Sequence, residues 1–174
     1  MSWIGSLAAK VAARLDDRDP VFYAADVTLF AMHEGVWHVL LIERGWAPDK
    51  GKLALPGGHV DAGESSEQAA RREAAEETGL DLSGVVLDRI GVYDAPDRDA
   101  RGRYVSVAYG AVLEDTIAPV AGDDAASAAW MPLPTAARVA HRGGFAFDHA
   151  DILFDAARRY GFGPDSPGSW DLWS

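Results

Sequence analysis

The segment that decides the fold is Gly57–Leu80, which reads GGHVDAGESSEQAARREAAEETGL. Its second part, Glu64–Thr78, is rich in Ala, Glu and Arg and contains no internal Gly or Pro, so it predicts a helix. Gly79 follows directly and suits the position after a helix end. The first part, Gly57–Gly63, predicts a glycine-rich loop in which the backbone can lie close to a ligand.

Three carboxylates recur along the predicted helix, at Glu73, Glu76 and Glu77. These positions share one helical face, so the like charges repel one another unless a cation lies between them. Hard oxygen ligands at this spacing suit Mg²⁺ or Mn²⁺, which retain waters and are commonly shared with substrate phosphates. A solvated acidic face, with Arg71 and Arg72 nearby, is the alternative interpretation.

Glu64 lies near the start of the predicted helix, where a negative charge interacts favourably with the helix dipole. Arg71 and Arg72 follow two turns later. We therefore expect an ion pair between Glu64 and this arginine pair that ties the loop to the helix.

The segment resembles the Nudix box, G-x5-E-x7-R-E-U-x-E-E-x-G-U, in which U is a bulky aliphatic residue. The matching positions are Gly58, Glu64, Arg72, Glu73, Glu76, Glu77, Gly79 and Leu80. Ala74 departs from the pattern because it is smaller than the usual residue at the first U position. The resemblance implies an α/β fold, the Nudix fold, which is an α/β/α sandwich with a mixed β-sheet, over residues 20–162.

The resemblance also implies a reaction, in which water attacks a phosphorus of a pyrophosphate linked to a nucleoside. Two or three Mg²⁺ or Mn²⁺ ions would assist, held by Glu73, Glu77 and the carbonyl of Gly57, with Glu76 as a third ligand or the holder of a metal-bound water. Arg72 would orient these acids, and Glu64 would pair with it as a structural strut. Catalytic residues implied in this way are Glu76, Glu77 and Arg72. The general base would be a box glutamate or a more distant acid, for which the candidates are Asp94, Asp97, Asp99 and Glu114.

Two segments outside the box resemble the ADP-ribose pyrophosphatase branch of the family. The first, Arg98–Gly102, reads R-D-A-R-G where the branch commonly has R-D-P-R-G, and the second, Phe147–His149, reads F-D-H. The implied substrate is ADP-ribose or a related nucleoside diphosphate derivative. Implied substrate-binding residues are Arg44, Lys52, Gly58, Arg98 and Arg101. A solvated basic loop and a helix cap with ordinary packing are the alternatives for the two segments.

Outward from the box, β-branched and aromatic residues and alternating patterns predict the remaining elements. Strands are expected at Phe22–Met32, Val36–Arg44, Leu53–Leu55, Val85–Tyr93, Tyr104–Leu113 and Ala128–Met131, the last at a sheet edge. The apolar run Val39–Ile42 suits a strand buried on both faces. Two helices are expected at Pro134–Ala140 and Phe147–Tyr160. Residues 1–19 predict an amphipathic helix and linker, and residues 163–174 predict an irregular tail.

The whole chain has 174 residues, 48% of them hydrophobic, which fits one domain of ordinary size. Its net charge of −11 argues against nucleic-acid or anionic membrane partners, so cations would mediate contact with an anionic substrate. The absence of cysteine excludes disulfides and thiol catalysis. Because no signal peptide and no apolar run of about 20 residues is present, we expect a cytoplasmic protein.

Two alternatives to the leading function are a nucleoside triphosphate pyrophosphohydrolase and a catalytically inactive Nudix-like ligand sensor. Sensors of this kind commonly carry a fused DNA-binding domain. Only 14 residues follow Tyr160, and the net charge opposes DNA binding, so we expect the enzyme. The N-terminal helix is expected to pack on its own domain, and the alternative is a homodimer contact, because relatives of the branch are often dimers.

Overall fold

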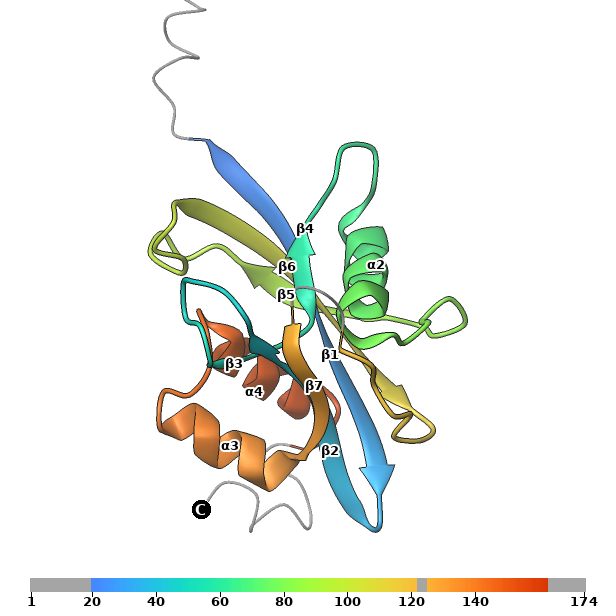
Figure 1. Cartoon of the computed structure of the whole chain (residues 1–174). Coiled ribbons are helices and arrows are strands. Elements are labelled where there is room, and N and C mark those ends of the chain that lie inside the picture. Colours follow the sequence, from blue (N-terminus) through green and yellow to red (C-terminus); the bar gives the residue numbers. More distant parts are fainter. Residues whose placement is uncertain (1–19, 122–124, 163–174) are drawn as a thin grey trace, which may run out of the picture.

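The computed structural model describes residues 20–121 and 125–162. The predicted N-terminal helix and C-terminal tail lie outside these residues. Figure 1 shows a central sheet with helix α2 (Ser66–Thr78) on one side and helices α3 (Leu133–His141) and α4 (His149–Arg159) on the other. This arrangement confirms the predicted α/β/α sandwich. None of the helices in the described ranges is long and apolar enough to cross a membrane.

The sheet contains strands that run both parallel and antiparallel. They are β1 (Val21–His33), β2 (Val36–Arg44), β3 (Leu53–Ala54), β4 (Gly57–His59), β5 (Asp88–Tyr93), β6 (Arg103–Leu113) and β7 (Ala125–Pro132). Their order is β3-β2-β1-β6-β5, with β4 paired to β1 and β7 paired to β2. Strands β1 and β6 are parallel, and the other pairs are antiparallel. The prediction of a mixed sheet is therefore confirmed.

Helices α2 and α4 each begin two residues later than predicted. Helix α2 begins after Ser65, whose side chain accepts from the amide of Gln68 while the Gln68 side chain accepts from the amide of Ser65. This capping box leaves Glu64 in the preceding loop. Helix α4 begins after Asp148, because the φ of Phe147 is +51° and is incompatible with a right-handed helix.

The first residues of the predicted glycine-rich loop instead form strand β4, which pairs with β1, and the starts of β5 and β7 differ from the prediction by three residues each. Strand β5 starts at Asp88, since Val85 donates to the carbonyl of Leu82 in a turn and does not join the sheet. Strand β7 starts at Ala125, three residues earlier than predicted, and pairs with β2 as far as Arg44. Alanine has a low strand propensity, so hydrogen bonding to β2 decides where β7 begins.

The core consists of one apolar layer on each face of the sheet. Alanines Ala69, Ala70 and Ala74 of α2 are fully buried against β1 and β6, and this packing fixes the rotation of the helix. On the other face, α3 and α4 pack against β1 and β2 around Phe30 and Leu153. The run Val39–Ile42 is buried on both faces as predicted, because its residues alternate between the two layers.

Candidate functional site

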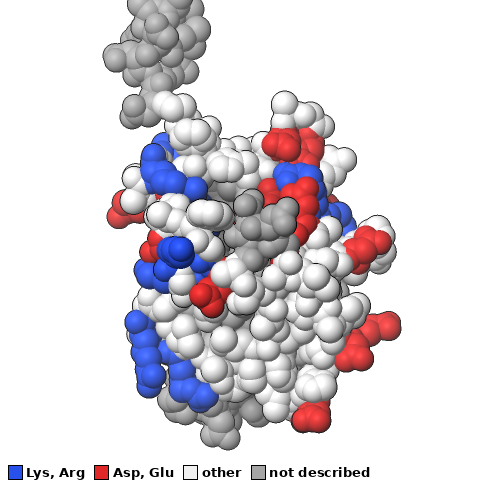
Figure 2. Space-filling view, viewed as in Figure 1, with Lys and Arg blue, Asp and Glu red and all other residues white. Residues whose placement is uncertain are grey.

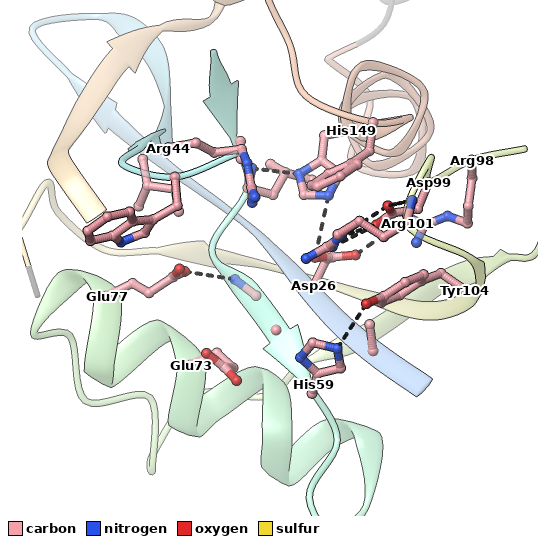
Figure 3. Close-up of a pocket in the computed structure, with 18 of the residues that line it drawn as sticks. Asp26, Arg44, His59, Glu73, Glu77, Arg98, Asp99, Arg101, Tyr104 and His149 are labelled. Atoms are coloured by element: carbon pink, nitrogen blue, oxygen red, sulfur yellow. Dashed lines mark hydrogen bonds and ion pairs between the residues drawn. The ribbon is translucent and has the colours of Figure 1, made fainter. Parts of the chain in front are cut away.

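A pocket of about 320 Å³ opens at one end of the sheet, between α2 and the start of α4. Its two sides carry opposite charge (Figure 3). Glu73 and Glu77 extend from α2 and form what we call the acidic wall. Arg44, Arg98 and Arg101 form what we call the basic wall. Figure 2 shows the same division on a larger scale, with most red side chains along the flank that contains α2 and most blue ones along the opposite flank.

The carboxylate of Glu77 is the most strongly perturbed group of the acidic wall. Its Oε2 accepts from the amide of Gly57 at 2.9 Å, a bond drawn in Figure 3. The pKa of Glu77 is raised to about 8 because the group is buried and the charges of Glu73 and Asp26 oppose its ionisation. Burial raises the pKa of Glu73 as well, although Arg72 acts against that shift. Ionisation of the acidic wall is therefore disfavoured in the protein alone, and a bound cation would favour it.

Two glycines of β4 lie directly between the acidic wall and β1. A Cβ atom on Gly58 would lie 2.3 Å from Oε1 of Glu73, and one on Gly57 would lie 2.3 Å from Oδ1 of Asp26. No side chain fits at either position without moving a carboxylate. The glycines thus let the backbone of β4 approach both acids.

Arg72 binds the remaining acids of the box beside the pocket. Its guanidinium group donates to Glu64 at 2.7 Å, to Glu73 at 2.9 Å and to Glu76 at 3.0 Å. A further bond reaches the carbonyl of His59. The side chain of Glu76 is 59% exposed, and Glu64, Arg72 and Glu76 do not line the pocket. The structure therefore brings Glu73 and Glu77 together in the pocket and places Glu76 outside it.

The arginines of the basic wall are held by acids from other segments. Arg98 donates to Asp148 through Nε at 2.8 Å and Nη2 at 2.5 Å, and its side chain is only 4% exposed. Arg101 donates to both carboxylate oxygens of Asp99. Arg98 is accordingly neither solvated nor free. Asp148 precedes α4 without capping it, so this carboxylate binds an arginine and not the helix amides.

Other predicted residues lie away from the pocket or are already bonded. Lys52 forms an ion pair with Asp49 at 2.8 Å and does not line the pocket. Among the candidate bases, Asp94, Asp97 and Glu114 are exposed and lie outside it. Asp99 does line the pocket, and although burial raises its pKa, bonds from Arg101 outweigh that effect and lower the pKa overall.

A chain of buried polar side chains forms the floor of the pocket, and its central residue, Asp26, was not predicted from the sequence. Its Oδ2 accepts from the hydroxyl of Ser106 at 2.5 Å, and its Oδ1 lies 3.6 Å from Nε2 of His149. Nδ1 of His149 accepts from the amide of Leu55 at 3.0 Å. Burial lowers the pKa of His149. A carboxylate inside the apolar run of β1 was the signal available in the sequence. Other pocket residues not recognised as site residues are Trp46, His59 and Tyr104.

Glu73 and Glu77 fit a divalent cation. Their carboxylates are hard oxygen donors, they open into the same pocket, and their raised pKa values reflect charge that a cation would stabilise. In residues 20–121 and 125–162, no group of three or more His, Asp or Glu side chains is arranged to hold a metal by itself. An ion here would thus take further ligands from backbone, water or substrate phosphates, which is common for Mg²⁺.

Comparison with known proteins gives related sequences and a related structure. The family model of the NUDIX domain matches residues 22–155. An ADP-ribose pyrophosphatase of Methanocaldococcus jannaschii is 42% identical over 122 residues, which are 69% of this chain and 66% of that protein. The ADPR responsive transcriptional repressor NtrR of Acinetobacter baylyi is 31% identical over 136 residues, 77% of this chain and 52% of that protein. The chain thus spans less than two thirds of the length of either relative.

A solved structure has the same fold. The NUDIX domain of Shewanella oneidensis NrtR, complexed with ADP ribose, superimposes with a TM-score of 0.73 at 29% identity. The match covers 86% of this chain and 97% of that domain.

Proposed function

The chain belongs to the Nudix family, and from this premise we propose that it hydrolyses the diphosphate of ADP-ribose or a related nucleoside diphosphate derivative. The products are a nucleoside monophosphate and the phosphate of the second moiety. The observation that carries the proposal is one pocket in which partly buried carboxylates face arginines. A diphosphate with a bound cation matches both charges, whereas a neutral ligand matches neither.

The basic wall has donors available for phosphate oxygens. Nε of Arg44 donates to the carbonyl of Pro48 at 3.0 Å, and in the described part of the chain neither of its Nη atoms donates to a protein atom. Arg101 uses Nε and Nη2 on Asp99, which leaves Nη1. Guanidinium groups suit phosphate oxygens because their donors are fixed in a plane and always charged.

The acidic wall is proposed to hold Mg²⁺ or Mn²⁺ through Glu73, Glu77 and the carbonyl of Gly57. Bound ions, two or three in number by family resemblance, would neutralise charge on the diphosphate and would lower the pKa of the attacking water. The amide of Gly57 orients Glu77, and Arg72, itself held by Glu64, orients Glu73. Glu76 remains a prediction as a further ligand, since its carboxylate is bonded to Arg72.

A second candidate function is an ADP-ribose sensor without turnover. The likeness to a transcriptional repressor, and to a repressor domain complexed with ADP ribose, favours it. The same pocket serves both functions, so binding of ADP-ribose alone does not distinguish them. Hydrolysis of ADP-ribose distinguishes the enzyme from the sensor.

The test is hydrolysis of a substrate panel with Mg²⁺ and with Mn²⁺. The panel contains ADP-ribose, NADH, UDP-glucose, diadenosine polyphosphates and dGTP. We expect AMP and ribose 5-phosphate from ADP-ribose. Cleavage of triphosphates alone would make the substrate assignment wrong. Binding of ADP-ribose by calorimetry, without cleavage of any member under either metal, would favour the sensor.

A further inference from the structure

The ring of Phe147 contacts two guanidinium groups of the basic wall. Cζ of Arg44 is 4.6 Å from the ring centroid, and Cζ of Arg101 is 5.3 Å from it. Both distances fall within the range in which a cation is attracted to an aromatic face. Arg101 also lies 4.8 Å from the centroid of Tyr104. One phenyl ring is thus the common contact of two arginines.

These two arginines are like charges that oppose each other in the same pocket. Burial lowers the pKa of Arg44, and the charge of Arg101 lowers it further. Asp99 holds Arg101 from one side and the carbonyl of Pro48 holds Arg44 from another. Neither of these contacts joins the two guanidinium groups to each other. Phe147 contacts both of them.

The backbone at Phe147 is held in an unfavourable conformation. Its φ of +51° is rare for a bulky side chain and persists only where surrounding contacts enforce it. Two contacts do so. The amide of Phe147 donates to Oδ2 of Asp49 at 3.2 Å, and the amide of Ala146 donates to the carbonyl of Leu53 at 2.8 Å. The loop before β3 and β3 itself therefore hold the backbone that carries the ring.

We propose that Phe147 is a positioning residue that holds Arg44 and Arg101 toward the pocket, where both donate to oxygens of one diphosphate group. The inference rests on the proposed function and deepens it, because it assigns recognition of the diphosphate to an aromatic residue that makes no ionic bond itself. The ring acts through the two arginines, so its loss weakens binding of the diphosphate and leaves the chemical step largely unchanged.

The test compares Phe147→Leu, which keeps apolar bulk and removes the π face, with Phe147→Tyr, which keeps it. Phe154→Leu is the matched control, since this aromatic residue lies on α4 against His141 and does not line the pocket. For each variant we would measure KM and kcat on ADP-ribose, the dissociation constant of ADP by calorimetry, and the melting temperature.

We expect Phe147→Leu to raise both KM and the dissociation constant of ADP about tenfold, with kcat within about twofold of the wild type. Phe147→Tyr should restore both constants, and Phe154→Leu should change neither. The effects of Phe147→Leu and Arg44→Gln should also be less than additive, because both remove the same contact. An unchanged ADP constant in Phe147→Leu would overturn the inference, as would a fall in kcat and melting temperature that tyrosine does not repair.

The binding measurement separates this inference from the proposed function. If the wild type binds ADP and does not cleave ADP-ribose, the proposed hydrolysis is wrong while the ADP constants still decide the role of Phe147. If the wild type does not bind ADP, the inference about Phe147 is wrong as well.

Discussion

The acidic and basic walls face each other across one pocket and are built in different ways. The acidic wall comes from a single helix, with Glu73 and Glu77 one turn apart. The basic wall combines the end of β2, the loop before β6 and acids from outside either element, such as Asp148. Arg98 and Arg101 each have a carboxylate partner within the protein. Among residues 20–121 and 125–162, the hydrogen-bond partner of Glu77 is a backbone amide.

Because of this difference, the two walls should contribute differently to turnover and to the free energy of unfolding. A bound cation would compensate negative charge on the acidic wall. Substituting one of its carboxylates should therefore lower turnover more than it lowers the free energy of unfolding. Carboxylates of the protein itself compensate most of the charge on the basic wall. Substituting one of its paired arginines should therefore lower the free energy of unfolding as well. The predictions below run from the largest expected effect to the smallest, and the first two test this division.

The strongest test of the acidic wall is Glu77→Gln. We expect kcat on ADP-ribose to fall about a thousandfold, because a metal-held phosphoryl oxygen represents several kcal/mol of transition-state stabilisation. The free energy of unfolding should not fall, since burial already disfavours the ionised carboxylate. Urea unfolding and steady-state kinetics measure the two effects. Glu67→Gln, on the same helix and bonded to Arg71, is the control that should retain activity.

The corresponding test of the basic wall is Arg98→Met. Removing one member of the buried pair leaves Asp148 without its cation, and we expect the free energy of unfolding to fall by about 3 kcal/mol. Arg158→Met breaks a pair with Asp155 in which the arginine is 64% exposed, and should cost less than about 1 kcal/mol. Equal losses in the two variants, measured by urea unfolding, would contradict the division between the walls.

Stability should also depend on pH through His149. Its pKa is lowered in the folded protein, mainly by burial, so below a pH of about 6.5 the unfolded state binds more protons than the folded state. The contribution of this histidine is therefore present at neutral pH and lost as the pH falls, by at most about 1.4 kcal/mol per pH unit. Unfolding of the wild type and His149→Asn between pH 5 and 8 should show a shallower dependence in the variant. Parallel curves would exclude this role.

The smallest expected effect concerns two buried hydroxyl groups beneath the pocket. In the described ranges the hydroxyl of Thr28 has no hydrogen-bond partner, whereas that of Ser106 donates to Asp26. Thr28→Val should raise the free energy of unfolding by about 1 kcal/mol, because an unpaired polar group leaves the core. Ser106→Ala should lower it by about 1.5 kcal/mol, because a bond to a carboxylate is lost. A destabilised Thr28→Val would mean that the hydroxyl has a partner after all.

The acidic wall could be predicted from the sequence because its residues are neighbours along one helix. Helical periodicity alone places Glu73, Glu76 and Glu77 on one face. What periodicity could not supply was the packing that turns Glu76 outward, which depends on Arg72 and on the buried alanines of α2.

The basic wall could be predicted only in part. Arg98 and Asp148 each belong to a segment that was identified from the sequence. Their ion pair joins residues 50 positions apart, and no local sequence pattern predicts it. Asp26 and Ser106 are 80 positions apart and meet because β1 and β6 pair side by side. Contacts of this kind follow from strand register, which the sequence leaves open.

The parallel pairing of β1 with β6 also has a consequence for how the molecule folds. Its register runs from Val21 opposite Arg103 to Ala31 opposite Leu113, so every pair closes a loop of roughly 80 residues. Closure on that scale is entropically costly and slow compared with the formation of a helix. A nascent chain that has just reached Leu80 contains the entire box and still lacks the strand that completes the pocket floor. The pocket can therefore bind a ligand only after β1 and β6 have paired, which is when the whole domain folds.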